Sequence, residues 1–154
     1  MAIVLLAAMP AMVMGCASSP AEPARGESGL SNVPSSGLGP QKLDPGECGL
    51  FLWSKTDTSR FIFFSKALSG TALFKQEDEQ LTLRQTRATG RIFGQFNTDI
   101  TYQDQNGSSI HLVYSSGDML TNGQRIKDGL ITVTDTTGWR TKLPVLGVRA
   151  CQPE

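Results

Sequence analysis

The side chains that could act in catalysis are few and scattered along the chain. His111 is the only histidine, so a catalytic triad or dyad that uses an imidazole must include it. It lies in SSIHLVYSS, where alternation puts it on the polar side of a strand, and no nucleophile motif accompanies it. We therefore interpret His111 as a structural or solvent-facing residue.

A run of carboxylates at Glu77, Asp78 and Glu79 could supply paired acids or bind a cation. It lacks the spaced ligands and the turn glycine of a calcium loop, so we interpret it as the charged end of a hairpin. The sequence also contains no P-loop and no Gly-x-Gly-x-x-Gly motif. These observations predict a protein that is not an enzyme and that has no metal or cofactor.

The chain begins with an apolar run that ends at a cysteine. Residues 2–13, AIVLLAAMPAMV, carry no charge and match the core of a signal peptide, but they are too few to span a bilayer. Val13-Met14-Gly15-Cys16 resembles the lipobox of bacterial lipoproteins. The resemblance implies that residues 1–15 are a signal peptide and that Cys16 receives a diacylglyceryl group and an acyl chain such as palmitate. The alternative is a buried N-terminal helix with an incidental cysteine.

Lipidation at Cys16 implies attachment to a membrane of the cell envelope. Each buried methylene of an acyl chain contributes about 0.8 kcal/mol, and more than one chain anchors a protein stably. In bacterial lipoproteins an aspartate after the lipidated cysteine favours the inner membrane, whereas Ala17 follows Cys16 here. The resemblance therefore implies an outer-membrane anchor, with the protein facing the periplasm.

Residues 16–47 have the composition of a flexible linker. They are rich in Ala, Ser, Pro and Gly, and few large apolar side chains are available to offset the chain entropy. We predict a disordered tether here and a single domain over residues 48–154. The chain has 14 basic and 14 acidic side chains, which is not the basic excess of a nucleic-acid-binding surface.

Residues 48–154 have the pattern of β-strands. EQLTLRQT, TDITYQD, SIHLVYS and LITVTDT alternate apolar and polar residues, and no segment has a convincing helical period. Asn106-Gly107, Asn122-Gly123 and Asp128-Gly129 supply the positive φ angles of tight hairpins. The sequence predicts an all-β domain, a small antiparallel sandwich or barrel, after the N-terminal tether.

Cys48 and Cys151 bracket this domain. With Cys16 assigned to lipid, they remain as a pair in a compartment that permits disulfide bonds. Two cysteines and one distant histidine do not make the tetrahedral ligand set of a zinc site. We therefore predict that Cys48 and Cys151 form a disulfide bond.

The segments CGLFLWSK and RFIFFSKAL break the alternation rule, because large apolar side chains fall on both of their faces. Strict alternation puts Leu50, Leu52, Phe61 and Phe63 on one set of faces and Phe51, Trp53, Ile62 and Phe64 on the other. Either both faces are covered within the fold, or one face is an exposed patch for a partner or ligand. The candidate binding residues are Phe51, Trp53, Phe61 and Phe63.

Two functions fit these observations. The first is a non-catalytic envelope lipoprotein whose β-domain binds another envelope protein, in an assembly, structural or inhibitory role. The second is a carrier or sensor in which the apolar hairpin lines a barrel cavity for a lipid or another small apolar ligand. The first function requires the aromatic residues to form an exposed surface, whereas the second requires them to surround an enclosed space.

Overall fold

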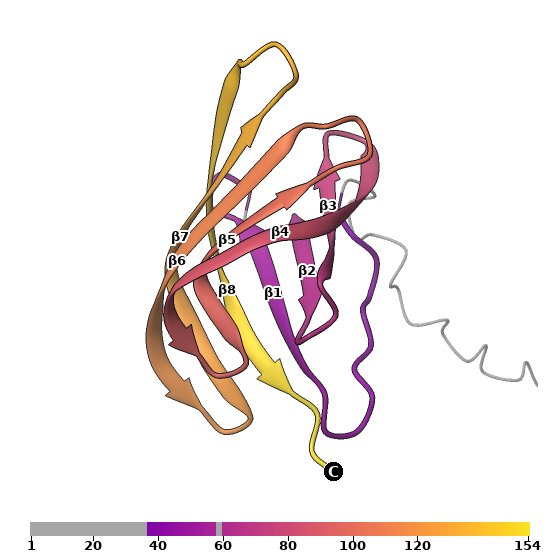
Figure 1. The fold of residues 1–154 in the computed structure, drawn as a ribbon. Helices are drawn as coiled ribbons and strands as arrows, with labels where there is room; N and C mark the ends of the chain where they lie inside the picture. The colour runs from indigo at the N-terminus through magenta and orange to yellow at the C-terminus, as the bar shows by residue number, and fades with distance from the viewer. Residues whose placement is uncertain (1–36, 58–59) are drawn as a thin grey trace, which may run out of the picture. The chain divides into compact units, whose positions relative to one another are not determined.

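The domain is a closed antiparallel β-barrel, which the computed structural model describes for residues 37–57 and 60–154. Each strand pairs with the next along the chain, and the last pairs with the first (Figure 1). The strands are β1 (Cys48–Ser54), β2 (Phe61–Lys66), β3 (Thr71–Gln76), β4 (Glu79–Phe93), β5 (Phe96–Gln103), β6 (Ser109–Leu120), β7 (Gly123–Thr134) and β8 (Arg140–Cys151). In these residues no helix is long and apolar enough to cross a membrane. The prediction of an all-β antiparallel domain is confirmed, and the architecture is the barrel.

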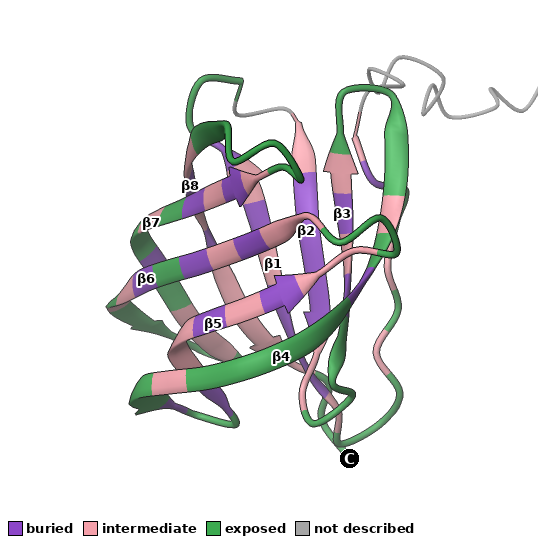
Figure 2. Ribbon diagram, turned by 45° about the horizontal axis from the view of Figure 1, so that its top comes forward, coloured by how far each residue is buried: buried purple, intermediate pink, exposed green. Residues whose placement is uncertain are grey.

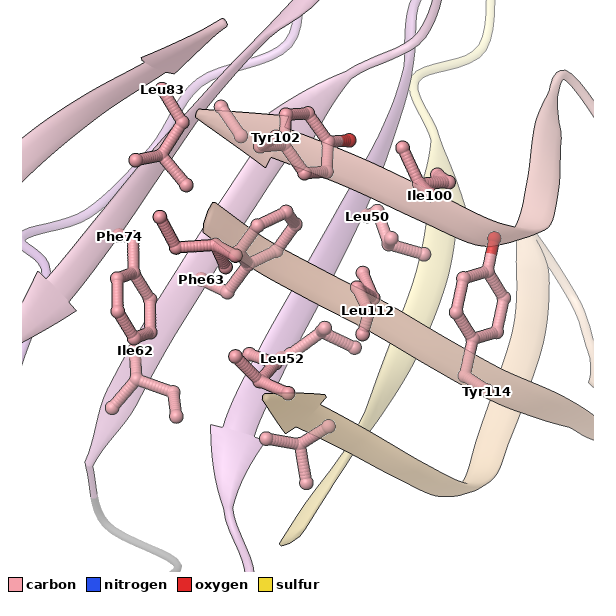
Figure 3. Packing of buried hydrophobic residues seen from close by; sticks show 14 of the residues in the cluster. Leu50, Leu52, Ile62, Phe63, Phe74, Leu83, Ile100, Tyr102, Leu112 and Tyr114 are labelled. Carbon is pink, nitrogen blue, oxygen red and sulfur yellow. The ribbon is translucent and has the colours of Figure 1, made fainter. Parts of the chain in front are cut away.

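Apolar side chains from the strands fill the interior of the barrel. Phe63, Phe74 and Tyr102 are among the largest of its fully buried side chains, and Figure 3 shows them converging with leucines from other strands. Eight strands enclose a space that side chains can fill. The alternating segments each send every second residue inward: Leu83, Ile100, Tyr102, Ile110, Leu112, Tyr114, Ile131 and Val133 are buried in the core, and Leu81 is partly buried against it.

A β-bulge changes the expected arrangement of side chains on β1 and β2. Leu52 pairs with Phe63 and Trp53 pairs with Phe61, which leaves Ile62 between them without an opposite residue in β1. Ile62 and Phe63 both join the core, whereas Phe61 packs against Trp53 on the outer face. The faces predicted for Phe61 and Ile62 are therefore wrong: Phe61 points outward and Ile62 points into the core. The extra residue of the bulge interrupts the alternation at this point of β2.

The disulfide bond closes the barrel between its first and last strands. Cys48 lies opposite Cys151 in the β1–β8 pair, and their Sγ atoms are at bonding distance. This confirms the predicted pairing. Cys16, the other cysteine, lies outside the described residues.

Residues 37–47, predicted as part of the linker, lie against β1 and β2 in the structure. Leu38 is buried, and its amide donates a 2.7 Å hydrogen bond to the Phe61 carbonyl. The Asp44 amide and the Lys66 ammonium group donate hydrogen bonds of 2.8 and 2.6 Å to the Glu47 carboxylate, and both lower its pKa. We call this segment the strap. The rest of the predicted linker lies outside the described residues.

Candidate binding surfaces

In the described part of the chain, His111 and the carboxylates at 77–79 lie in different parts of the barrel. Within residues 37–57 and 60–154, no three histidine, cysteine, aspartate or glutamate side chains are placed to hold a metal ion. Glu77 and Asp78 form the turn between β3 and β4, and Glu79 begins β4, as expected for a hairpin end. His111 is partly exposed, and its Nε2 lies 2.9 Å from Asp99 Oδ1.

One end of the barrel holds a small hollow. A hollow of about 240 Å³ opens at the end of the barrel where β1 stops and β2 begins, which is smaller than the roughly 300–1,000 Å³ of typical small-molecule sites. The hollow is lined by Ile62, Val133 and Leu143 and by charged residues that include Lys75 and Glu77. An apolar ligand here would face charged side chains.

Two phenol groups lie deep inside the barrel. The hydroxyls of Tyr102 and Tyr114 are buried and have no hydrogen-bond partner in the described part of the chain. Burial raises the pKa of both phenols above the ordinary value for tyrosine. Both side chains are therefore neutral at physiological pH.

An apolar hollow lies on the outer surface, over β1, β8 and β7. The β1–β8 register places Trp53 opposite Leu146, and Val148 follows on the same face of β8. Arg125 and Lys127 of β7 stand at the edge of the hollow, which has a volume of about 340 Å³. We call this feature, with these five residues, the Trp53 hollow.

Further aromatic rings extend the apolar surface from Trp53 toward β2. Phe61 lies 5.0 Å from Trp53 and 6.0 Å from Phe51 between ring centroids, and Phe51 lies 4.9 Å from Phe64. The strap covers the side of this cluster away from Trp53. Leu43 of the strap, Phe51 and Phe64 all approach Gly49, since a Cβ added there would lie 2.8–3.1 Å from an atom of each. Trp53, beyond the strap, is only half-buried.

The edge of the Trp53 hollow carries positive charge. Arg125 and Lys127 are exposed, and neither forms an ion pair with any described residue. Asp128, which follows Lys127, is paired instead with Lys55 at 2.6 Å. The ammonium group of Lys55 donates a hydrogen bond to this carboxylate and lowers its pKa.

The structure brings together three of the four candidate binding residues. Phe51, Trp53 and Phe61 are half-buried neighbours on the outer surface, whereas Phe63 is fully buried in the core and is not accessible to a partner. Sequence reasoning missed the rest of the hollow, which β7 and β8 supply. The apolar run LPVLGV was the one available signal for it.

Comparisons of the chain with family models, curated proteins and solved structures give no match. The surfaces described above are therefore the basis for a functional proposal.

Proposed function

We propose that this protein is a lipid-anchored, non-catalytic binding module of the cell envelope, and that it docks another envelope protein through the Trp53 hollow. One observation carries the docking proposal: an aromatic side chain lies in an outer apolar hollow, and the two cations at its edge form no ion pair with any described residue. Tryptophan and arginine are enriched among the residues that dominate binding energy at interfaces. The matching surface on the partner presents an apolar side chain flanked by carboxylates.

The packing of Trp53 suits it to anchor a partner. Its ring rests on Phe61, with 5.0 Å between the centroids, so little side-chain freedom remains to be lost on binding. The partner would cover the part of Trp53 that is still exposed, together with Leu146 and Val148. Burial of aromatic and aliphatic area then supplies the affinity, and the charges at the edge select the partner.

The anchor is the second part of the proposal, and Cys16→Ser tests it. A serine hydroxyl does not replace the thiol that forms the thioether to the lipid, so the variant is expected to remain an uncleaved, unacylated precursor. In a detergent phase-partition experiment, wild type should enter the detergent phase with the mass of a lipidated chain that begins at Cys16. Normal processing and normal lipid mass in the Cys16→Ser variant would refute the anchor.

The docking surface is tested by Trp53→Ser, and independently by the double variant Arg125→Glu, Lys127→Glu. Both are expected to lose envelope proteins that co-purify with wild type from detergent-solubilised membranes, because one removes the anchor and the other reverses the charge at the edge. Ile92→Ser is the matched control, since Ile92 is apolar and 83% exposed on β4, outside the hollow. This control should retain the same proteins.

Thermal unfolding of each variant separates docking from folding. The charge-reversed side chains are exposed, so that variant should melt close to wild type even if Trp53→Ser loses stability. Retention of all partners by folded Trp53→Ser and by the charge-reversed variant would overturn the proposal. Equal loss in Ile92→Ser would also overturn it, because the binding would then not depend on this hollow.

A further inference from the structure

A second surface, on β4 to β8, carries a line of polar and charged side chains. Strand pairing places Arg87, Thr101, His111, Thr132 and Lys142 side by side, each on a different strand; Figure 2 shows these strands in order. Neighbouring strands are about 4.8 Å apart, so the line extends about 19 Å along the sheet. We call it the polar row. It runs through a shallow hollow of about 580 Å³.

The hollow around the polar row is positively charged. Arg87 stands at one end and Lys142 at the other, next to Arg140, and all three are exposed. None of the three forms an ion pair within the described residues. Asp99 is the only carboxylate among the described residues that line the hollow, and it is bound to His111. The chain as a whole has no net charge, so the positive excess is a local property of this surface.

Hydrogen-bonding groups make up the floor between the cations. The hydroxyls of Thr101, Ser109, Thr132 and Thr134 each can donate and accept a hydrogen bond. Because the Asp99 carboxylate only accepts, His111 Nε2 is the donor in their 2.9 Å contact. This contact orients the imidazole within the hollow.

The composition of the hollow favours one kind of ligand over others. Protein interfaces have an apolar and aromatic core, whereas Leu130 is the one large apolar side chain among the described lining residues. Single-stranded nucleic acids are bound through aromatic side chains on which bases stack, and no described residue of the lining is aromatic. An acidic polysaccharide offers carboxylates for Arg and Lys, and many hydroxyls for Thr and Ser.

We propose that the polar row binds an acidic polysaccharide. The carboxylates of the polysaccharide pair with Arg87 at one end of the row and with Lys142 and Arg140 at the other. The hydroxyls of the polysaccharide form hydrogen bonds with the threonines between these cations. These residues are not those of the Trp53 hollow, so the two surfaces are tested independently.

The test measures binding of the purified full-length protein to polygalacturonate oligosaccharides by isothermal titration calorimetry. Arg87→Gln and Lys142→Gln should each raise Kd roughly tenfold, since each removes a charge-assisted hydrogen bond. Thr132→Val, which replaces a floor hydroxyl by a methyl group, should weaken binding by a smaller factor. Lys127→Gln removes a cation from a different surface and should leave Kd unchanged.

Two further ligands distinguish sugar recognition from simple charge attraction. Neutral dextran should not bind, and single-stranded DNA should bind more weakly than polygalacturonate, because it lacks the sugar hydroxyls that the floor recognises. The proposal is overturned if polygalacturonate does not bind, or if dextran or DNA binds equally well. It is also overturned if Arg87→Gln and Lys142→Gln are both folded and keep the wild-type Kd, or if Lys127→Gln weakens binding as much as these two variants do.

Discussion

Removal of the Cys48–Cys151 bond is expected to lower the free energy of unfolding by about 4.7 kcal/mol, because the bond closes a loop of about 100 residues in the unfolded chain. The two cysteines are separated by 103 positions. For a domain of this size the loss corresponds to a fall in melting temperature of roughly 15 °C or more.

The position of the bond adds a reason to expect a large effect. β1 and β8 come from opposite ends of the domain, and their pairing over seven residue pairs closes the barrel. Formation of this pair without the bond requires the whole barrel to be in place, since the intervening strands connect the two partners. The bond keeps β1 and β8 close together even when the barrel opens.

The parent protein for this measurement carries Cys16→Ser, so that Cys48 and Cys151 are its only cysteines. The parent is compared with Cys48→Ala, Cys151→Ala and the double variant, each made in the same Cys16→Ser background. The three variants should melt at similar temperatures, since loss of either cysteine breaks the bond, and reductant should bring the parent protein to the same value. Mass spectrometry after alkylation should find no free thiol in the oxidised parent. Two alkylated thiols in that protein, or no change in melting temperature, would contradict the expectation.

Alternation of side chains predicted much of the fold, because one face of most strands contacts water. Along β6, Ile110 and Leu112 are buried and His111 between them is partly exposed, as the sequence indicates. The same rule fails on β2, since a bulge adds one residue and no residue type in FIFF marks its place. As a result, Phe61 lies on the outer surface and Ile62 is part of the core.

Both candidate surfaces depend on contacts that the sequence does not encode locally. Trp53 meets Leu146 only because β1 pairs with β8, and the polar row exists only because four successive strand pairs align their registers. Alternation is enough to put His111 on the polar face of its strand, but only the paired registers put it in one line with Thr101 and Thr132. The strap could not be predicted for a related reason: a buried Leu38 and a Leu43 close to the Phe51 and Phe64 rings hold this Pro- and Gly-rich segment on the barrel, and average composition does not reveal two such residues.

Gly147 illustrates a constraint that only the closed barrel explains. It lies on β8 opposite Leu52 of β1 and Ile126 of β7. A Cβ at this position would collide with the backbone carbonyl oxygen of Phe51 and would lie 2.8 Å from Leu52 Cδ2. The leucine side chain can rotate away, whereas the β1 backbone can move only by loosening the pair that closes the barrel. Glycine is therefore required here by the close approach of the two strands.

Gly147→Ala is accordingly expected to destabilise the protein by about 3 kcal/mol, toward the upper end of the usual cost of overpacking, because the obstacle is backbone. Differential scanning calorimetry should find a melting temperature lower by roughly 10 °C. The direction of the change in stability is informative, since replacing a strand glycine with alanine ordinarily stabilises a protein by about 0.5–1 kcal/mol through chain entropy. Gly39→Ala is the matched control, because no atom lies within 4 Å of its added Cβ, and it should change stability by no more than about 0.5 kcal/mol. Equal melting temperatures for the two variants would show that β1 and β8 can separate to admit a methyl group, and would contradict a tightly closed barrel.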